Sequence, residues 1–287
     1  MKVFEALERA VARLEAQAIP HARLDAELLL SGPLRQNRSY LLAHQRDELP
    51  EEIVRKFFDL LLERESGKPL QYILGRQEFY GLDFEVSPAV LIPRPETELV
   101  VEEALRRFSV KRARVVDVGT GSGCIAVALA VHAPETEVFA VDLSAPALEV
   151  ARRNADKHCV AGRVHLAQAD LLTAFRLTPD FDGVVSNPPY VADSDVQNLQ
   201  REVRDWEPRL ALTAGARGLA VYQDLIPQAW QLLKPGGVLI LEIGYTMRET
   251  VCRLMRQPWA RVDVREDLSG IPRVVIAEKK SSTAVFE

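Results

Sequence analysis

Cysteine is scarce in this 287-residue sequence, and its spacing argues against two classes of protein. The three cysteines, Cys124, Cys159 and Cys252, lie far apart, and neither a C-x-x-C pair nor a suitable histidine arrangement accompanies them. Disulfide-rich secreted domains and zinc domains both need a recognisable set of such residues. We therefore expect a protein of a reducing compartment, the cytoplasm, and no metal site.

Long apolar runs are also missing. The longest uninterrupted run covers residues 124–131, whereas a transmembrane helix needs about 20 apolar residues. The N-terminal stretch MKVFEALERAVARLEAQ carries charges throughout, and it lacks the apolar centre of a signal peptide. The sequence therefore predicts neither export nor insertion into a membrane.

The sequence also has no excess of positive charge. The chain has 36 Lys and Arg against 41 Asp and Glu, a net charge of −5, so no bulk positive field attracts it to nucleic acid or to an anionic membrane. Residues 1–75 are nearly balanced, with 11 basic and 12 acidic residues. This balance favours a solvated or protein-facing surface over a nucleic-acid-binding arm.

The sequence contains two kinds of hydrophobic periodicity. Residues 1–75 carry apolar residues at helical spacing, which predicts a small N-terminal helical bundle. Residues 76–92 contain two short strand-like runs around a glycine and predict a hairpin linker. Residues 93–287 alternate strand-like and helix-like segments. They predict an α/β fold with a doubly wound, mostly parallel seven-stranded sheet covered on both faces.

A glycine-rich turn follows the first strand of this predicted sheet. The run Gly119-Thr120-Gly121-Ser122-Gly123 leads into an apolar helix, so the backbone can pass close to a ligand and the helix N-terminus offers N–H donors. No lysine follows, so the run is not a phosphate-binding loop of the G-x-x-x-x-G-K-[ST] type. Asp142 lies 19 residues after Gly123, at the end of the next strand, where a carboxylate accepts hydrogen bonds from ribose hydroxyls. Together these features predict an adenosine-binding site.

Two adenosine cofactors compete for this site, NAD and S-adenosylmethionine. Asp117, just before the loop, would repel a pyrophosphate and attract the cationic end of S-adenosylmethionine, so we expect the latter. Asp170, at the end of the third strand, is expected to bind the adenine amino group while Leu171 packs against the ring. A capping role in the following segment is an alternative for Asp170.

The fourth strand ends in Asn187-Pro188-Pro189-Tyr190, at the sheet edge where ligands bind in this fold. The prolines remove two N–H donors and hold Asn187 extended. A planar NH2 group therefore meets two acceptors, the Asn187 side-chain oxygen and the Pro188 carbonyl, while Tyr190 covers its flat face. These acceptors would aim a conjugated amine at a methyl group and stabilise its developing charge. A rigid turn with a half-buried tyrosine is the structural alternative.

Several longer stretches resemble one known family. DVGTGSGCIAVALA, VDLS, VVSNPPY, LIPRPETELVVEEAL, EPRLAL, LKPGGVLILEIGY and DLSGIPRVVIAEK are similar to the protein-(glutamine-N5) methyltransferases that modify peptide-chain release factors, the family also called HemK. The likeness spans nearly the whole chain. One departure is Ala216-Arg217-Gly218-Leu219, where the family leads us to expect an acidic residue before the glycine. That segment is expected to begin a surface helix.

The resemblance implies a Rossmann-like methyltransferase domain at residues 93–287, with S-adenosylmethionine as cofactor and S-adenosylhomocysteine as its product. It implies cofactor contacts at Gly119 through Gly123, Asp142, Asp170, Leu171 and Asn187. It implies a glutamine amide held by Asn187, Pro188, Pro189 and Tyr190, of which Asn187, Pro188 and Tyr190 are catalytic. The implied substrate is the Gly-Gly-Gln tip of class 1 release factors, recognised by the helical domain of a monomer that needs neither nucleic acid nor a membrane.

Two further segments belong to the family pattern. Residues 92–97, IPRPET, are expected near the same pocket, although Pro95 and the acids after it also suit a well-capped helix start. Glu242 fits the pattern, but its role does not follow from the sequence.

Three other functions compete with release-factor methylation. The same chemistry would serve a glutamine of ribosomal protein L3. Adenine-N6 methylation of DNA would use the same acceptors but needs a basic groove, which the charge balance disfavours. An inactive cofactor-binding module would be expected to have lost Asn187 or Asp142, and both are present.

Overall fold

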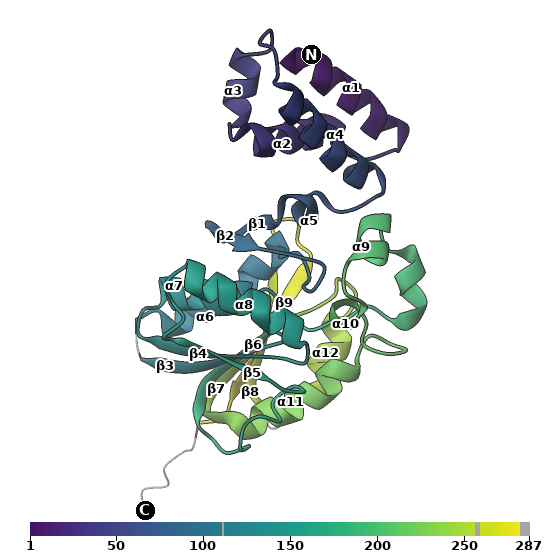
Figure 1. Ribbon diagram of the computed structural model, residues 1–287. Coiled ribbons are helices and arrows are strands. Elements are labelled where there is room, and N and C mark those ends of the chain that lie inside the picture. The colour runs from purple at the N-terminus through teal and green to yellow at the C-terminus, as the bar shows by residue number, and fades with distance from the viewer. Residues whose placement is uncertain (111, 256–258, 282–287) are drawn as a thin grey trace, which may run out of the picture. The chain divides into compact units, whose positions relative to one another are not determined.

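The computed structural model describes residues 1–110, 112–255 and 259–281. The chain folds into two units (Figure 1). The helical unit comprises residues 1–76 together with residues 200–206, and the sheet unit comprises residues 77–199 together with the chain from residue 207 onward. Residues 282–287, the end of the range expected for the methyltransferase domain, lie outside the described residues.

The helical unit is built from amphipathic helices, as the spacing of its apolar residues predicts. They are α1 (Val3–Ala16), α2 (Ala22–Leu34), α3 (Arg38–Ala43), α4 (Glu51–Glu65), α5 (Leu70–Leu74) and α9 (Arg201–Trp206). The apolar faces of α1 to α5 form one core that includes Leu7, Leu14, Leu29, Phe57 and Leu61, whereas α9 has no buried residue. Burial of these faces supplies most of the stability of such short helices.

A buried arginine connects three helices of this unit. Arg64 of α4 is 3% exposed; its Nε donates to Asp25 of α2 at 2.7 Å and its Nη2 to Glu202 of α9 at 2.6 Å. Arg201 also donates to the Ser66 carbonyl oxygen at 2.9 Å. These contacts explain why residues 200–206, which the sequence places within the range 93–287, cluster with the helical unit.

The segment expected as a hairpin linker forms two short antiparallel strands, β1 (Arg76–Phe79) and β2 (Leu82–Glu85). Tyr80 and Gly81 form the turn with φ of 52° and 73°, the left-handed conformation that two-residue hairpin turns require. Asn154 holds β2 to helix α8 (Ala145–Lys157), because its Oδ1 accepts from the Glu85 N–H at 2.7 Å and its Nδ2 donates to the Glu85 carbonyl at 3.0 Å.

The sheet unit confirms the predicted seven-stranded, mostly parallel sheet. Its spatial order is β5-β4-β3-β6-β7-β9-β8, with the first five strands parallel and β9 antiparallel to both neighbours. The strands are β3 (Ala113–Val118), β4 (Thr136–Asp142), β5 (Val164–Gln168), β6 (Phe181–Ser186), β7 (Leu233–Glu242), β8 (Trp259–Glu266) and β9 (Pro272–Lys279). The strand order reverses direction between β3 and β6, and this is where ligands bind in doubly wound sheets.

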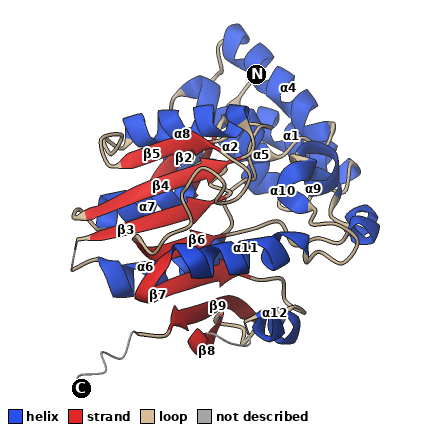
Figure 2. Ribbon diagram, turned by 90° about the horizontal axis from the view of Figure 1, so that it is seen from below, coloured by secondary structure: helices blue, strands red, loops and turns tan. Residues whose placement is uncertain are grey.

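Helices cover both faces of the sheet (Figure 2). One core joins the strands to α6 (Glu98–Phe108), α7 (Cys124–His132) and α8, and a second joins them to α11 (Ala220–Leu232) and α12 (Arg248–Leu254). Short helical turns, η1 (Pro95–Thr97), η2 (Asp193–Asn198) and α10 (Arg209–Leu212), lie in the connections. Within the described part of the chain, no helix is both long enough and apolar enough to cross a bilayer.

Candidate active site

The glycine-rich turn joins β3 to α7 in a conformation that needs glycine. Gly119, Gly121 and Gly123 have φ of 70°, 55° and 79°, the left-handed region that side chains disfavour. The N–H groups of Gly119 and Thr120 both donate to the Val141 carbonyl oxygen, at 2.9 and 3.0 Å. The turn is therefore fastened to the end of β4.

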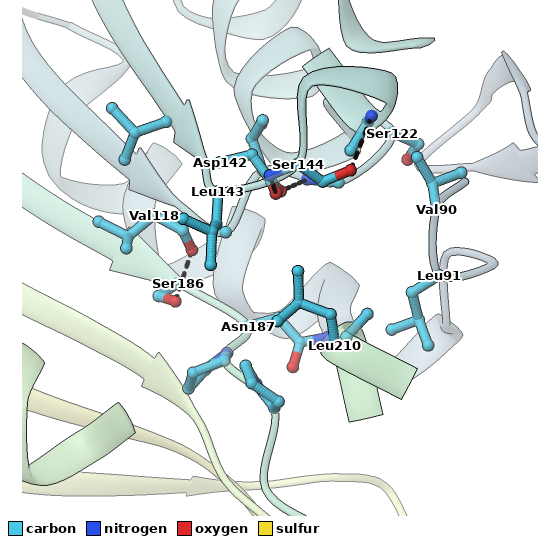
Figure 3. Close-up of a pocket in the computed structure, with 18 of the residues that line it drawn as sticks. Val90, Leu91, Val118, Ser122, Asp142, Leu143, Ser144, Ser186, Asn187 and Leu210 are labelled. Atoms are coloured by element: carbon cyan, nitrogen blue, oxygen red, sulfur yellow. Dashed lines mark hydrogen bonds between the residues drawn. The ribbon is translucent and has the colours of Figure 1, made fainter. Parts of the chain in front are cut away.

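Asp142, the last residue of β4, is fixed by the same turn. Its Oδ2 accepts from the Gly121 N–H at 2.9 Å and its Oδ1 from the Ser144 N–H at 2.8 Å. Figure 3 shows Asp142 with Leu143 and Ser144 at one side of the pocket. Each carboxylate oxygen has two lone pairs, so both can still accept a hydrogen bond from a ligand.

A cavity of about 220 Å³ lies at this edge of the sheet. It brings together most of the predicted site residues, namely Gly119, Thr120, Gly121, Ser122, Asp142, Asp170, Leu171, Asn187, Pro188 and Pro189. Apolar residues that the sequence did not single out, among them Val90, Leu91, Leu143 and Leu210, complete the walls (Figure 3). Leu143 and Leu210 are 49% and 55% exposed, so an apolar group in the cavity would cover them.

Two predicted site residues, Gly123 and Tyr190, are not among the described residues that line the cavity. An added Cβ at Gly123 would lie 3.1 Å from the Cβ of Ala151 in α8, so this glycine permits close helix packing. Tyr190 packs against the core beneath α11, and burial raises the pKa of its hydroxyl to about 12.

Asp117 lies beneath the turn and does not line the cavity within the described part of the chain. The side chain is fully buried and its Oδ2 accepts from the Thr120 hydroxyl at 2.6 Å. Burial raises the pKa of Asp117 to about 7. Asp117 therefore shapes the turn, and its charge is a weaker argument for the choice of cofactor than the sequence suggested.

Asp170 and Leu171 follow β5 and both face the cavity. Leu171 has φ of 50°, an uncommon value for a residue with a side chain. The Asp170 backbone carbonyl accepts from the N–H and hydroxyl of Thr173. Its carboxylate has no hydrogen-bond partner within the described chain, so it is available to a ligand.

Cys124 also lines the cavity, but it is not poised as a nucleophile. Burial raises the pKa of its thiol to about 12, and a nucleophilic cysteine needs a lowered pKa. The sequence-based interpretation of Cys124 as a small helix residue agrees with this environment.

Asn187 follows β6 and is joined to a residue far away in the sequence. Its Nδ2 donates to the Thr97 hydroxyl at 2.9 Å, and that hydroxyl donates to Glu242 Oε2 at 2.6 Å. Thr97 belongs to the IPRPET segment and lines the cavity, whereas Glu242 ends β7. Glu242 is 2% exposed, and burial raises its pKa to about 7.

The segment that departs from the family pattern lies directly against the Asn-Pro-Pro-Tyr turn. Gly218 has φ of 67°, and an added Cβ there would lie 2.2 Å from the Tyr190 carbonyl oxygen. The Val191 N–H donates to the Leu212 carbonyl at 2.9 Å, and the Ala214 N–H donates to the Val191 carbonyl at 3.0 Å. The sequence predicts a surface helix start here, but the segment also supports the turn, and α11 begins only at Ala220.

The chain matches two known family models and many relatives. The PrmC N-terminal domain model matches residues 5–75, and the methyltransferase small domain model matches residues 96–204. The release factor glutamine methyltransferase of Koribacter versatilis (strain Ellin345) is 44% identical over 283 residues, which cover 98% of this chain and 100% of the relative. That of Geobacter sulfurreducens is 44% identical, over 91% of each chain.

A methyltransferase from Pyrococcus furiosus has a similar structure, with a TM-score of 0.53 and 19% identity over 70% of this chain and 91% of that chain. This likeness shows the fold alone. The sequence relatives go further, because they are 44% identical over 98% and 91% of this chain, so the matches extend over both units. The resemblance noted in the sequence is thereby confirmed, and the chain belongs to the release factor glutamine methyltransferase family.

Proposed function

We propose that this protein transfers a methyl group from S-adenosylmethionine to the side-chain amide nitrogen, N5, of the glutamine in the Gly-Gly-Gln motif of class 1 peptide chain release factors, and thereby affects translation termination. One observation carries the proposal: a single cavity is lined both by the glycine turn with Asp142 and by Asn187 with the two prolines. A cofactor site and an amide site thus meet at one sheet edge.

The chain's own groups fit the cofactor. The carboxylate of Asp142 is already oriented by two backbone N–H groups, and it would accept the ribose hydroxyl protons. Asp170 would accept from the adenine amino group, and Leu143 and Leu171 would cover the ring. The turn residues Gly119 through Ser122 let the backbone approach the remainder of the molecule. When bound, S-adenosylmethionine supplies an electrophilic methyl group on a sulfonium ion.

The amide site would act by positioning and electrostatics. A glutamine amide nitrogen is a poor nucleophile because its lone pair is delocalised into the carbonyl group. Asn187 Oδ1 and the Pro188 carbonyl would accept hydrogen bonds from the two amide N–H groups. Pro189 would line the site, and Tyr190, which packs against the core, would support the turn. The acceptors would hold the nitrogen toward the methyl group and stabilise the positive charge that develops on it. The amide nitrogen would form a bond to the methyl carbon as the bond from that carbon to the sulfonium sulfur breaks, which leaves S-adenosylhomocysteine. The nitrogen would then lose one proton to solvent water, and because this loss follows the transfer, no strong base is needed before the methyl group moves.

The division of labour between the domains is part of the proposal. Residues 1–75 would recognise the release factor, residues 76–92 would link the domains, and residues 93–287 would carry catalysis. The match of residues 5–75 to the PrmC N-terminal domain supports the first assignment. We further propose a cytoplasmic monomer that needs neither nucleic acid nor a membrane, since its substrate is a translation protein.

The test is mass spectrometry of a purified class 1 release factor after incubation with this protein and S-adenosylmethionine. Ribosomal protein L3 and adenine-containing DNA serve as parallel substrates. We expect one methyl group in place of one hydrogen on the Gly-Gly-Gln glutamine, and no change in the other two. Methylation of L3 or DNA alone would overturn the proposed substrate and leave the family assignment intact.

A further inference from the structure

Three side chains from distant parts of the sequence, Glu242, Thr97 and Asn187, form a hydrogen-bond chain that ends at Asn187. Thr97 lies 90 residues from Asn187 and 145 residues from Glu242. Thr97 and Glu242 are each 2% exposed. The backbone carbonyl of Glu242 accepts from the Tyr222 hydroxyl at 2.8 Å, so the end of the chain is itself held in place.

The chemistry of these groups determines which group donates and which accepts in each hydrogen bond. Above its pKa of about 7 Glu242 is ionised, and an ionised carboxylate can only accept hydrogen bonds. The Thr97 hydroxyl must therefore give its single proton to Glu242, which leaves its lone pairs for Asn187. An amide oxygen cannot donate, so the Asn187 group that faces Thr97 must be the NH2.

The position of the other side-chain atom of Asn187, the oxygen Oδ1, follows from this arrangement. Within the described chain, Asn187 Oδ1 has no hydrogen-bond partner, and Asn187 lines the cavity. An amide rotated by 180° has nearly the same shape but would present NH2 to the substrate. In that orientation the NH2 group of Asn187 would face the NH2 group of the substrate amide. Both groups are donors, so the substrate nitrogen would lose the acceptor that the proposed reaction requires.

We propose that Thr97 and Glu242 are positioning residues, which fix the Asn187 amide so that its oxygen, and not its NH2 group, faces the substrate nitrogen. This inference rests on the proposed function, because it assigns an orientation to the acceptor in that same amide site. Neither residue touches the substrate: Thr97 acts through Asn187, and Glu242 acts through Thr97.

The test compares Thr97→Val with Thr97→Ser. Valine has nearly the shape of threonine but lacks the hydroxyl, whereas serine retains it. With the release factor as substrate, we expect Thr97→Val to lower kcat by about 10- to 100-fold, because misplacement of a catalytic group by about 1 Å can cost 10²-fold. The KM for the release factor and the Kd for S-adenosylmethionine should change little. Thr97→Ser should recover most of the lost kcat.

Thr136→Val is the matched control. Thr136 is 1% exposed and its hydroxyl donates to the Phe108 carbonyl oxygen at 3.4 Å, so the substitution removes a buried hydroxyl at the N-terminal end of β4. We expect wild-type kcat from this variant. Thermal unfolding of each variant reports whether it is folded. Glu242→Gln is a second test if Thr97→Val does not fold, because a glutamine amide can either accept from Thr97 or donate to it, so the direction of the hydrogen bonds is no longer fixed.

The outcomes separate the two proposals. If wild-type protein does not methylate the release factor, the proposed function fails and this inference falls with it. If the wild type is active and Thr97→Val keeps its kcat, only the positioning role is refuted. Equal losses in Thr97→Val and Thr97→Ser, or a loss confined to cofactor affinity, would also refute it.

Discussion

Asn187 and Asp142 face one cavity, but the proposed mechanism gives them different partners. Asn187→Ala should lower kcat by about 10²- to 10³-fold, the effect of losing one preorganised polar group in an active site, with little change in the Kd for S-adenosylmethionine. Asp142→Asn should weaken cofactor binding by about 10- to 100-fold, because a hydrogen bond to a charged group contributes about 1.5–3 kcal/mol. Steady-state kinetics with calorimetric titration of the cofactor measures both effects.

Asp142→Asn is preferable to an alanine substitution because Asp142 also accepts from the Gly121 and Ser144 N–H groups. Asparagine retains one acceptor and therefore disturbs the turn less. If both variants lost cofactor affinity equally, the separation between an amide site and a cofactor site would be wrong.

Glu242 predicts a pH dependence of turnover. Its pKa is about 7 because it is buried. Above this pH the carboxylate accepts from Thr97; below it the protonated carboxyl can donate instead, and the direction of the chain to Asn187 is no longer fixed. We therefore expect kcat at saturating cofactor to fall as the pH is lowered through about 7. The titratable groups that interact electrostatically with Glu242 are Glu96, Arg273, Arg94, Tyr190, Tyr222 and Cys124.

A pH–rate profile of Glu242→Gln checks this assignment. Glutamine does not titrate, so the fall in kcat near neutral pH should disappear in the variant. Asp117 also has a pKa of about 7, but it lies under the cofactor turn, and saturating cofactor removes its effect on binding. A profile unchanged from wild type would assign the titration to another group.

Among the individual site residues, the sequence predicts those that belong to a local pattern. The glycine turn and Asp142 are recognisable from their spacing, and Asn187 from the two prolines after it. Thr97 and Glu242 are not, because their partners lie 90 and 145 residues away and only the folded sheet brings them together. The only signal was that both residues fit the family pattern, Thr97 within IPRPET and Glu242 within LKPGGVLILEIGY, and IPRPET suited a helix start equally well.

Among the elements, the connection before α11 should matter more than its surface position suggests. Gly218→Ala would place a Cβ 2.2 Å from the Tyr190 carbonyl oxygen, so the turn that follows Asn187 must move. The left-handed backbone should lower the free energy of unfolding by about 1–2 kcal/mol, as it does for an ordinary residue. The displaced turn should lower kcat in addition. Kinetics and thermal unfolding together measure the two contributions.

Gly215→Ala is the matched control for this substitution. Gly215 has φ of 73°, close to the 67° of Gly218, but its added Cβ would lie 3.6 Å from the nearest heavy atom, the Cβ of Ala220. The two variants share the backbone strain and differ in the clash. Equal kcat values in both would show that the contact with Tyr190 has no functional role.

The buried arginine of α4 makes a separate prediction for the helical unit. Arg64→Met leaves Asp25 buried without its partner, and breaking a buried ion pair in this way costs about 3–5 kcal/mol. Lys56→Met in the same helix is the control, because Lys56 pairs with Glu52 while the two side chains are 54% and 64% exposed, and exposed pairs contribute about 0–1 kcal/mol. Urea unfolding followed by circular dichroism compares them. Similar losses in the two variants would contradict the buried role of Arg64.

The elements themselves were largely predictable, since the hydrophobic period distinguishes the helices of residues 1–75 from the strands after residue 112. The membership of α9 in the helical unit was not. Arg64 and Glu202 are 138 residues apart, and nothing in the α9 sequence REVRDW indicates a partner so distant.

For the whole molecule, cofactor binding should appear as a gain in stability. A ligand that binds only the folded state stabilises it by about 2.7 kcal/mol at 100 times its Kd, which raises Tm by about 2–4 °C per kcal/mol in a domain of 150–250 residues. We expect S-adenosylmethionine and S-adenosylhomocysteine to raise Tm, and NAD to leave it unchanged. Differential scanning fluorimetry at several ligand concentrations measures the shifts.

The same titration distinguishes binding in the described cavity from binding elsewhere. Asp142→Asn should need about 10- to 100-fold more cofactor for the same shift, in proportion to its weaker affinity. Asn187→Ala should shift as the wild type does, although it no longer turns over. A rise in Tm with NAD would favour the competing cofactor. Because Asp117 is buried under the turn with a raised pKa, its charge would oppose NAD only weakly, so the discrimination against NAD that we expect comes from the residues that line the cavity.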